Sequence, residues 1–517
     1  MESDFLNLAH HGLYTDLYEL TMLYGYFNHN KIEDVVTFEV HFRKLPFNGG
    51  YAVIAGIPDV LNYLNNLSFT DSDLVYLESL NKFSKEFLQY LKSFRFTGVI
   101  EFIPEGRVVF PYEPIIQITA KFGEAQLIES AILNMINYQT LIATKASRIV
   151  TSAYPNKVLE FGLRRAQNDA SIVGARASVI GGCIGSSNVM AGKLYGIPVS
   201  GTHAHSWIMS FANNHDDVKE TELRAFRAYA EIYPADTILL VDTYNTLLSG
   251  VPNAIVVGKE LKEKGFTLRG IRIDSGDLVW LTTESAKMLD REGLTETLIV
   301  LSNDLDENII ESIQLQFKKQ LENADEKDKE FYNRLYHRIV YGVGTSLITG
   351  SGDKQSALTG VYKLTEINNK AVMKFSENIE KRTNPHRKEL WRIEKDNTYL
   401  VDVISLPTDD NPKSQDTIYH VSDPSKKLKL PPKCTISHLY FLIDFSKQDL
   451  IQNQLKEHIS IDSWKKAQIR LQDDLKKLDY SYIRLLNPHT YKISLSEKLM
   501  DIKKDLQNFY SNFDELI

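Results

Sequence analysis

The middle of the chain alternates short apolar runs with longer segments that have helical spacing. Six runs between residues 158 and 345 each lead directly into charged, hydroxyl-bearing or glycine residues. They are VLEFGLRR from Val158, IPVSGTHAHSW from Ile197, ILLVDTYNT from Ile238, IRIDSGD from Ile271, LIVLSNDLD from Leu298 and RIVYGVGTS from Arg338. Apolar runs of β-branched residues followed by amphipathic segments are typical of buried parallel strands and crossover helices. The pattern predicts an α/β fold with a TIM-like (β/α) barrel.

Polar residues at the ends of these runs are the first indication of a site. In a (β/α) barrel the loops after the strands open on one face, so residues distant in sequence meet in one pocket. The residues that we expect there are Glu160, Arg164, His205, Asp242, Arg272, Asp274, Asn303 and Thr345. Such a gathering is typical of an active site.

The segment before the barrel-like repeat has mixed character. LYTDLYELTMLYGYF has the spacing of a helix, and VVTFEVHF, YAVIAG, VIEFIP, RVVF and IIQITA are strand candidates. A long helix is expected from about Gln126 to Ile149. This segment predicts an amino-terminal α/β domain over residues 1–145, followed by the barrel-like domain over 146–365.

The alternation stops after Gly360. VYKLTEINNKAVMKF predicts a hairpin with Asn368 and Asn369 at its turn. Residues 378–433 are polar and contain several prolines, whereas the last 60 residues have helical spacing and many lysines. We therefore expect a carboxy-terminal domain over 366–517, to which the sequence assigns no role.

Composition narrows the class of protein. With 517 residues, 43% hydrophobic and 24% charged, the chain can form more than one core. A net charge of −8 argues against general nucleic-acid or membrane-surface binding. Cys183 and Cys434 are the only cysteines, too few for a four-thiolate zinc site and consistent with a reducing compartment. The amino terminus lacks a signal-peptide pattern, so we expect a cytoplasmic protein.

The glycines at 342–344 allow two interpretations. Gly342 and Gly344, followed by Thr345, could place backbone N–H groups around a phosphate. Glycines after a strand are equally suited to turning the chain. A phosphate site late in a parallel barrel is a recurring placement, which favours the first interpretation.

The His-Ala-His sequence also allows two interpretations. His203 and His205 could be two metal ligands on an extended segment, but no third soft ligand lies near them in sequence. A histidine at a strand end also suits an acid, a base or a nucleophile near neutral pH. We favour this second role for His205 and expect His203 to shape the loop.

Asp242 and Asp274 each end a short, mainly apolar run. They could cap helices together with Thr243 or Ser275. They could instead accept hydrogen bonds from sugar hydroxyls or hold Mg²⁺ on a polyphosphate through water. Basic residues nearby, namely Arg164, Arg165 and Arg272, can donate two parallel hydrogen bonds to a phosphate or a carboxylate. Acid and base together indicate a charged sugar phosphate as substrate.

Several motifs in one order resemble a known family. LYTDLYELTMLYGYF, FEVHFRKLPFNGGYAV, LEFGLRRAQ, GTHAHSW, VDTYNT, RIDSGDL and GVGTS are similar to those of nicotinate phosphoribosyltransferases, between Leu13 and Leu364. The resemblance implies a type II phosphoribosyltransferase with an irregular, incomplete barrel, which forms a homodimer with active sites between subunits. It implies synthesis of nicotinate mononucleotide and pyrophosphate from nicotinate and phosphoribosyl pyrophosphate, with Mg²⁺ and with ATP as co-substrate. This ATP-coupled ligase reaction is the entry from nicotinate to NAD.

The resemblance also assigns roles by position. Nicotinate would contact Tyr18 of the other subunit, Phe161, Thr202 and Arg272. The residues implied for phosphoribosyl pyrophosphate are Arg43, Lys44, Arg164, Asn303, Gly342, Gly344 and Thr345. Asp242 and Asp274 would act on the ribose or its Mg²⁺, and His205 would be the histidine that ATP phosphorylates.

Three alternatives stay open. Nicotinamide enzymes of this fold place an aspartate near the position of SSN at 186–188, and Asn188 lacks that charge. Quinolinate enzymes need further basic residues for a second carboxylate. A catalytically silent metabolite-binding module is the alternative outside enzymology.

Overall fold

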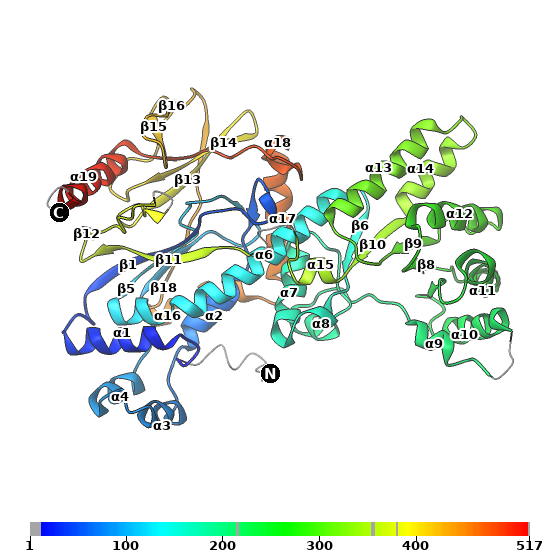
Figure 1. Cartoon of the computed structure of the whole chain (residues 1–517), viewed down its shortest axis with the longest axis horizontal. Coiled ribbons are helices and arrows are strands. Elements are labelled where there is room, and N and C mark those ends of the chain that lie inside the picture. Colours follow the sequence, from blue (N-terminus) through cyan, green and yellow to red (C-terminus); the bar gives the residue numbers. More distant parts are fainter. Residues whose placement is uncertain (1–11, 214–216, 353–356, 379–380, 515–517) are drawn as a thin grey trace. The chain divides into compact units, whose positions relative to one another are not determined.

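The computed structural model describes residues 12–213, 217–352, 357–378 and 381–514 (Figure 1). Its contacts divide the chain into two compact units. Unit 1 comprises Met1–Thr144 and Gly352–Ile517, and unit 2 comprises Lys145–Ser351. The segment expected to be a separate carboxy-terminal domain thus falls in the same compact unit as the amino-terminal segment. The long α6 (Glu129–Ala153) begins in unit 1 and ends in unit 2.

A six-stranded antiparallel sheet joins the two ends of the sequence within unit 1. Its order is β12-β11-β1-β5-β3-β18. The strands are β1 (Val35–Phe42), β3 (Val99–Phe102), β5 (Ile116–Lys121), β11 (Gly360–Ile367), β12 (Lys370–Ala371) and β18 (Phe441–Asp444). The predicted hairpin is confirmed, since Asn368 and Asn369 connect β11 to β12 with positive φ angles of 47° and 62°. Asparagine tolerates this left-handed backbone better than most residues.

A second sheet of unit 1 lies within the polar, proline-containing region. Its order is β16-β15-β19-β14-β13-β17. The strands are β13 (Glu389–Lys395), β14 (Thr398–Ser405), β15 (Thr417–His420), β16 (Lys427–Lys429), β17 (Thr435–His438) and β19 (Ile493–Leu495). Its core contains Ile393, Val401, Val403, Ile418 and Leu430, each at most 1% exposed. Two short strands, β2 (Ala52–Val53) and β4 (Val108–Val109), pair separately.

Helices complete unit 1. The predicted amino-terminal helix is confirmed as α1, and the predicted helical carboxy terminus is confirmed apart from β19. The helices are α1 (Leu17–Asn28), η2 (Pro46–Asn48), α2 (Ile57–Asn66), α3 (Asp71–Ser79), α4 (Lys85–Lys92), α5 (Phe122–Leu127), α16 (Gln448–Ile459), α17 (Ser463–Lys477), α18 (Tyr480–Ile483) and α19 (Glu497–Asp514). No helix in the described part of the chain has the length and apolar character needed to cross a membrane.

Unit 2 is built on five parallel strands in the order β6-β10-β9-β8-β7. They are β6 (Lys157–Glu160), β7 (Ile238–Leu240), β8 (Gly270–Ile273), β9 (Leu298–Leu301) and β10 (Ile339–Val343). Five of the six predicted strands are therefore confirmed. The prediction of a regular strand from Ile197 is wrong, because Ser186 and Val199 form only isolated bridges beside β6. Pro198 has no N–H with which to continue a ladder.

The sheet of unit 2 does not close into a barrel among the described residues. The chain has a mixed α/β fold, and the incomplete barrel stays a prediction. Leu159, Ile238, Val300 and Val340 form one apolar cluster under the strands. The helices are η3 (Leu163–Arg165), α7 (Asn168–Ile180), α8 (Val189–Tyr195), α9 (His205–Met209), α10 (Val218–Ile232), η4 (Thr246–Gly250), α11 (Val251–Glu263), α12 (Leu278–Arg291), α13 (Glu307–Asn323), α14 (Lys329–Arg338) and α15 (Thr345–Ile348).

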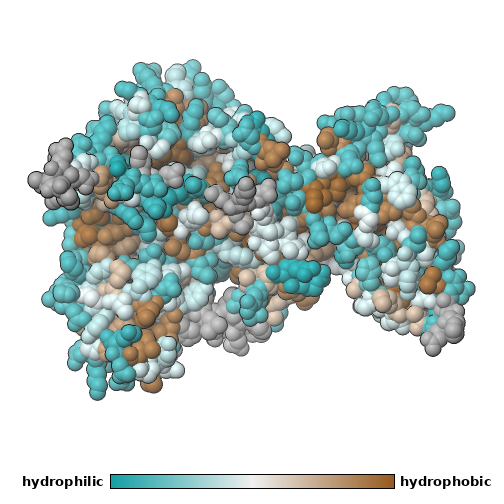
Figure 2. Space-filling view, viewed as in Figure 1, coloured by the Kyte–Doolittle hydropathy of each residue, from teal (hydrophilic) through white to brown (hydrophobic). Residues whose placement is uncertain are grey.

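The surface combines hydrophilic areas with smaller hydrophobic patches. On the face shown in Figure 2, hydrophilic side chains predominate and hydrophobic ones form separate patches. Among the exposed apolar side chains, α1 contributes Leu17 at 49%, Tyr18 at 45% and Met22 at 39% exposure. Tyr18 and Met22 are four positions apart and therefore lie on one side of α1, so this helix exposes an apolar pair to solvent.

Candidate functional site

The carboxyl ends of the parallel strands of unit 2 surround a pocket of about 150 Å³. Eight residues that we predicted for a site line it, whereas Glu160, His205 and Asp242, which we also expected in the pocket, are not among its lining residues. The eight are Phe161, Arg164, Arg272, Asp274, Asn303, Gly342, Gly344 and Thr345. The lining also includes Arg165, Ser302 and Asp304. Arginines and carboxylates therefore face one small cavity.

Arg272 is the most connected side chain of this pocket. Its Nε donates to Ser302 Oγ at 2.9 Å, its Nη1 to Thr202 Oγ1 at 3.1 Å and its Nη2 to Asp274 Oδ1 at 3.0 Å. Its guanidinium carbon lies 5.7 Å from the centre of the Phe161 ring. A guanidinium has five N–H donors, and the described residues accept three of them, which leaves one donor on each Nη. That pair matches the two oxygens of a carboxylate.

The ion-pair partner of Arg272 is Asp274. Positions 272 and 274 are two residues apart on extended backbone, so their side chains point to the same side. Ser302 also donates to Asp274 Oδ1, which joins the three side chains in one network. The arginine and the carboxylate thus hold each other in place at the pocket.

Asp242 and Asp274 do not cap helices. The residue that caps α12 is Asp277, whose side chain accepts from Trp280 N, and Asn245 caps η4 by accepting from Leu248 N. Asp242 Oδ2 instead accepts from Asp274 N at 2.9 Å and from the hydroxyl of Ser275 at 2.6 Å. The capping interpretation is therefore wrong for both aspartates.

One oxygen of Asp242 has no partner. Oδ1 is buried and makes no hydrogen bond among the described residues. A buried carboxylate oxygen without a partner is costly, and such atoms are often completed by a ligand or an ion. Asp242 Oδ1 is therefore available to a ligand or an ion.

His203 and His205 differ in their surroundings. Burial lowers the pKa of His203 to about 4, so this ring is neutral near pH 7. Its Nε2 accepts from Leu240 N at 3.2 Å, and its ring lies 4.9 Å from that of Tyr229. His205 starts α9, is only half-buried and has Nδ1 3.0 Å from Thr243 Oγ1. Thus His203 supports the loop, whereas His205 is accessible beside the end of β7.

Within the described ranges, the two histidines have no third metal ligand beside them. No group of three or more His, Cys, Asp or Glu side chains suited to a metal ion occurs among the described residues. A carboxylate pair can still bind Mg²⁺ when substrate oxygens and water complete the octahedron. Asp242 and Asp274, with one unpartnered carboxylate oxygen, fit this second kind of site.

The glycine segment is shaped first by packing. A Cβ on Gly342 would lie 2.4 Å from Cε2 of Phe161, so this position must be glycine for the ring to fit. Phe161 N also donates to Val343 O at 2.8 Å. The helix opened by Thr345 has only four residues, so its dipole adds little to anion binding. The absence of a side chain at Gly342 thus leaves room for the Phe161 ring at the pocket. Phosphate binding by the glycines stays a prediction.

Glu160 does not line the pocket, but its contacts stabilise the backbone next to it. It is fully buried, and its carboxylate accepts from Ser186 Oγ at 2.5 Å and from Gly162 N. Burial raises the pKa of this carboxyl group. Its contacts fix the backbone on both sides of Phe161.

Three predicted residues belong to unit 1. Tyr18 lies on α1, and Arg43 and Lys44 follow β1. Arg43 is half-buried, and its Nε has no hydrogen-bond partner among the described residues. The roles given to these three residues stay predictions.

The pocket also contains residues that the sequence analysis did not select. Ser302 and Asp304 flank Asn303, and both Asn303 and Asp304 have positive φ angles, of 101° and 40°. Strained backbone of this kind is concentrated at functional sites. The sequence already indicated these residues, since Ser302, Asn303 and Asp304 directly follow an apolar run. Of the three, only Asn303 was predicted for the site.

The fold and the pocket define a class of protein: an α/β protein with a polar, cation-containing pocket at the carboxyl ends of parallel strands. Family models identify it further. The nicotinate phosphoribosyltransferase (NAPRTase) N-terminal domain matches residues 13–137, the NAPRTase family model 156–401 and the C-terminal domain model 387–503. The chain belongs to the nicotinate phosphoribosyltransferase family.

Individual relatives agree with this assignment. The nicotinate phosphoribosyltransferase of Bacillus subtilis (strain 168) is 40% identical over 500 residues, covering 94% of this chain and 93% of the relative. The Caenorhabditis elegans protein of the same name is 34% identical, covering 94% and 92%. The crystal structure of human nicotinic acid phosphoribosyltransferase has a TM-score of 0.78 at 28% identity, covering 95% of this chain and 99% of that one.

Proposed function

We propose that the chain transfers the phosphoribosyl group of phosphoribosyl pyrophosphate to nicotinate, giving nicotinate mononucleotide and pyrophosphate. The observation that supports this proposal most directly is how the Arg272 side chain is held and which of its donors remain. Three hydrogen bonds fix its guanidinium beside the Phe161 ring, while one donor remains on each Nη. A flat ring with one carboxylate matches an aromatic face next to a free pair of N–H donors.

The reaction depends mainly on how the two substrates are positioned. A pyridine nitrogen already carries a lone pair, so no base has to deprotonate it. The protein must align this nitrogen with the anomeric carbon and stabilise the departing pyrophosphate. Phe161 and Arg272 would hold the ring, with Thr202 fixing Arg272 through its hydroxyl. Arg164, Asn303 and the segment 342–345 would hold the sugar phosphate.

Mg²⁺ is expected as the cofactor. Asp242 and Asp274 would hold it, directly or through water, together with oxygens of phosphoribosyl pyrophosphate. The unpartnered Oδ1 of Asp242 supports this assignment. When bound, Mg²⁺ supplies positive charge against the negative charge of the leaving pyrophosphate.

ATP coupling is a separate part of the proposal. His205 would be phosphorylated by ATP, as its match to the family motif implies, which would make the enzyme an ATP-coupled ligase. Its half-buried position beside Thr243, the residue after Asp242, supports this role, because a phosphoryl group there would alter the charge around the proposed Mg²⁺. The product would then enter NAD biosynthesis in the cytoplasm.

The nearest alternative substrate is nicotinamide. In this chain Asn188 Oδ1 accepts from Ala191 N at 3.1 Å and Nδ2 donates to Ser171 O at 3.2 Å. The side chain is 1% exposed. Both polar atoms of the Asn188 side chain are thus engaged within the protein, Oδ1 in capping α8. The side chain has no carboxylate that could accept a hydrogen bond from the amide nitrogen of nicotinamide, which favours the anionic nicotinate as substrate.

One experiment separates these functions. The purified chain is incubated with phosphoribosyl pyrophosphate, Mg²⁺ and ATP, and nicotinate, nicotinamide or quinolinate is offered separately. Mononucleotide should form rapidly only from nicotinate. Use of nicotinamide at a comparable rate would refute the substrate assignment. Nicotinate binding without pyrophosphate release would favour a silent binding module.

We also propose a homodimer with shared active sites, in which Tyr18 of one subunit completes the pocket of the other. Inactive Tyr18→Ala chains mixed with inactive Arg164→Ala chains should then recover activity. After random exchange about half of the dimers are mixed, and each of these has one intact site. Absence of recovery after proven exchange would exclude a shared site.

A further inference from the structure

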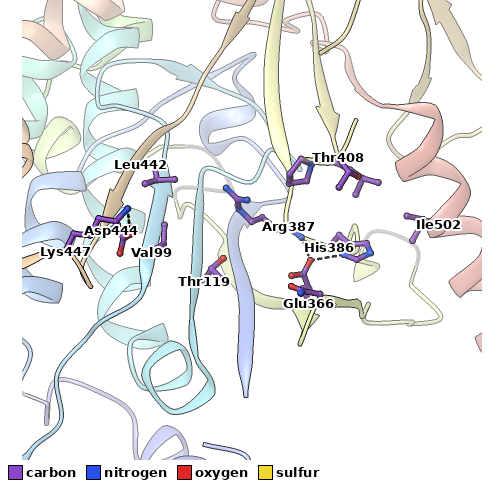
Figure 3. Close-up of a pocket in the computed structure, with 13 residues that line it drawn as sticks. Val99, Thr119, Glu366, His386, Arg387, Thr408, Leu442, Asp444, Lys447 and Ile502 are labelled. Atoms are coloured by element: carbon purple, nitrogen blue, oxygen red, sulfur yellow. Dashed lines mark hydrogen bonds and ion pairs between the residues drawn. The ribbon is translucent and has the colours of Figure 1, made fainter. Parts of the chain in front are cut away.

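Two carboxylates on the six-stranded sheet of unit 1 have donors that stabilise their negative charge. They line a cavity of about 680 Å³ (Figure 3). Glu366 Oε2 lies 2.7 Å from His386 Nδ1, and the hydrogen bond from His386 lowers the pKa of Glu366. Asp444 Oδ2 lies 2.9 Å from Lys447 Nζ, and hydrogen bonds from Ser446 and Lys447 lower the pKa of Asp444. These partners keep both carboxyl groups ionised near neutral pH.

Glu19 of α1 is a carboxyl group of the same unit in different surroundings. Its side chain is fully buried, and the described residues that act on its charge include no cation. The titratable groups that face it are Asp16 and Tyr18 at the start of α1, Glu129 of α6, Tyr63 of α2 and Tyr362 of β11. Lys363 of β11 acts on Glu129 and not on Glu19. An ionised Glu19 would therefore be buried among acids and phenols, which is costly.

The carboxyl group of Glu19 joins α1 to the start of α6. Its Oε1 accepts from Ser130 N at 3.0 Å, one of the first N–H groups of α6, which have no acceptor within their own helix. Ser130 Oγ lies 2.8 Å from the same oxygen and 2.6 Å from Asp16 Oδ2. Thr15 Oγ1 contacts Glu19 Oε2 and lies 3.0 Å from Leu127 O. All of these groups belong to unit 1.

The number of protons in these contacts indicates which group donates. Two hydroxyl groups make four oxygen–oxygen contacts, but each hydroxyl has one proton. Leu127 O is a carbonyl oxygen and can only accept, so the proton of Thr15 is used there. The contact between Thr15 Oγ1 and Glu19 Oε2 is then a hydrogen bond only if Glu19 carries a proton. The proton of Ser130 is left for Asp16, which is exposed and whose charge water can solvate.

Burial acts in the same direction as this proton count. It raises the pKa of Glu19 from 4.5 to about 7, against the opposite effect of hydrogen bonds from Ser130 and Tyr18. Burial, followed by the charges of Glu129 and Glu19, also raises the pKa of Tyr18, so this phenol keeps its proton. Glu19 is thus the group of this cluster that changes its charge near neutral pH.

We propose that Glu19 is a positioning residue: a neutral carboxylic acid that donates to Thr15, accepts from Ser130 N and so fixes the start of α1 on α6. When the proton passes to solvent, the donor is lost, a negative charge is left buried beside Glu129, and α1 loosens. This helix carries Tyr18, which under the proposed function completes the pocket of the other subunit. The effect on catalysis therefore rests on the proposed function, whereas the protonation of Glu19 does not.

Infrared spectroscopy of the full-length protein tests the protonation directly. The difference spectrum of wild type minus Glu19→Gln at about pH 6 should contain the C=O stretching band of one protonated carboxyl group. This band should disappear with a midpoint near pH 7. Glu78→Gln is the matched control, because Glu78 is exposed on α3, and its difference spectrum should lack the band. Absence of the band from the Glu19→Gln difference spectrum would overturn the proposal.

Thr15→Val determines the direction of the contact with Glu19. If Glu19 donates to Thr15, the variant loses a hydrogen bond of the neutral acid, so the infrared midpoint should fall by about 0.4 to 1 pH unit. If Thr15 instead donates to an ionised Glu19, the same change should raise the midpoint. A midpoint that rises or stays the same contradicts the proposal. This comparison uses wild type and Thr15→Val and does not depend on the folding of Glu19→Gln.

Stability gives an independent measurement. The folded-state pKa of about 7 lies above the ordinary value of 4.5, so the folded chain binds more protons than the unfolded chain between these values. The stabilisation by Glu19 is therefore complete below about pH 4.5 and is lost as the pH rises through about 7. Relative to Glu19→Gln, the melting temperature of the wild type should fall by about 2 to 5 °C between about pH 5 and 8. A difference that is constant with pH would show that Glu19 is ionised throughout.

Enzyme kinetics test whether this proton affects the proposed reaction. Glu19→Gln keeps an N–H donor for Thr15 at every pH, so it should hold α1 in place where the wild type does not. The ratio of the wild-type KM for nicotinate to that of Glu19→Gln should rise at least about threefold between about pH 6 and 8.5, with little change in the ratio of kcat values. A constant KM ratio, with the infrared titration observed, would refute the positioning of Tyr18 by Glu19. Failure of both proteins to form mononucleotide would refute the proposed function, and the infrared result would still decide the protonation of Glu19.

Discussion

Two arginines, one in each unit, show how the same side chain serves structure or function. In unit 1, Arg392 is 2% exposed, and its Nε and Nη2 contact both oxygens of Asp402. Nη2 also donates to Val108 O, and Nη1 lies 3.5 Å from Asp474 Oδ2. In unit 2, Arg272 is 19% exposed and retains donors at a pocket. A charge enclosed by its own protein stabilises the fold, whereas a charge left partly unmatched is available to a ligand.

The same contrast separates the two histidines of unit 2. His203 is buried, neutral and bonded to backbone, and His205 is accessible at a strand end. Predictions based on this contrast test whether accessible groups affect chemistry and enclosed groups affect stability.

The largest effect is expected for His205. His205→Ala should abolish acid-labile phosphate labelling by ATP and leave slow synthesis that does not depend on ATP, because other residues position the substrates. The melting temperature should stay close to that of the wild type, since the side chain makes one hydrogen bond. Labelling is measured with ATP carrying a radioactive γ-phosphate.

His203→Gln is the matched control for this experiment. It should lower stability, because the neutral ring is buried against Tyr229, yet still allow labelling of His205. Equal labelling of His205→Ala and wild type would show that the phosphate is carried elsewhere.

Arg392→Met should cause the largest loss of stability. It would leave Asp402 buried without its cation, which typically costs about 3 to 5 kcal/mol, whereas Asp474 keeps Arg107 at 2.6 Å. Urea unfolding should report this loss. Arg227→Met is the control, because the Arg227–Glu260 pair is about half exposed and should contribute at most about 1 kcal/mol. Similar losses in both variants would contradict the distinction between enclosed and exposed pairs.

Arg272→Gln should change binding more than stability. Loss of a charged partner at a binding site costs about 2 to 5 kcal/mol, which corresponds to about 30- to 1,000-fold weaker nicotinate binding. Binding of phosphoribosyl pyrophosphate should change less, and the preference for nicotinate over nicotinamide should decrease. Isothermal titration calorimetry and thermal melting measure the two effects. Normal nicotinate binding by a variant that melts far below wild type would make Arg272 a structural ion-pair residue.

The sequence was informative where one physical effect dominates. Continuous apolar runs located β6 to β10 because strands buried on both faces need them. The run at Ile197 misled because Pro198 interrupts a ladder that hydropathy alone would continue. The second sheet of unit 1 was missed because strands such as Glu389–Lys395 alternate apolar and charged residues within a polar region.

The candidate site was predictable in position but not in its contacts. Polar residues after strands must lie at the same edge of a parallel sheet, which is why the pocket contained them. The pairing of Arg272 with Asp274, the bridge through Ser302 and the free oxygen of Asp242 depend on side-chain geometry. Sequence spacing does not encode that geometry directly.

The smallest effect is expected for a buried amine. Burial lowers the pKa of Lys503 from 10.5 to about 8, and its Nζ donates to Asn384 Oδ1 and Val421 O. A neutral amine has two N–H donors, which match these two acceptors. The folded chain therefore releases this proton at lower pH than the unfolded chain does. Since the unfolded state binds more protons between pH 8 and 10.5, the contribution of Lys503 to stability rises across this interval.

Lys503→Met should remove this pH dependence. Relative to the variant, the wild type should gain about 1 to 3 kcal/mol in unfolding free energy between pH 7.5 and about 10. Other groups titrate in the same range, so the difference between the two proteins is the quantity to measure, by urea unfolding at each pH. The Arg392 network should give no such slope, because burial, which lowers the pKa of the guanidinium, is outweighed by the neighbouring Asp402, and the pKa is raised. A wild-type-minus-variant difference that is constant with pH would mean that Lys503 stays charged in the folded protein and belongs with the enclosed ion pairs.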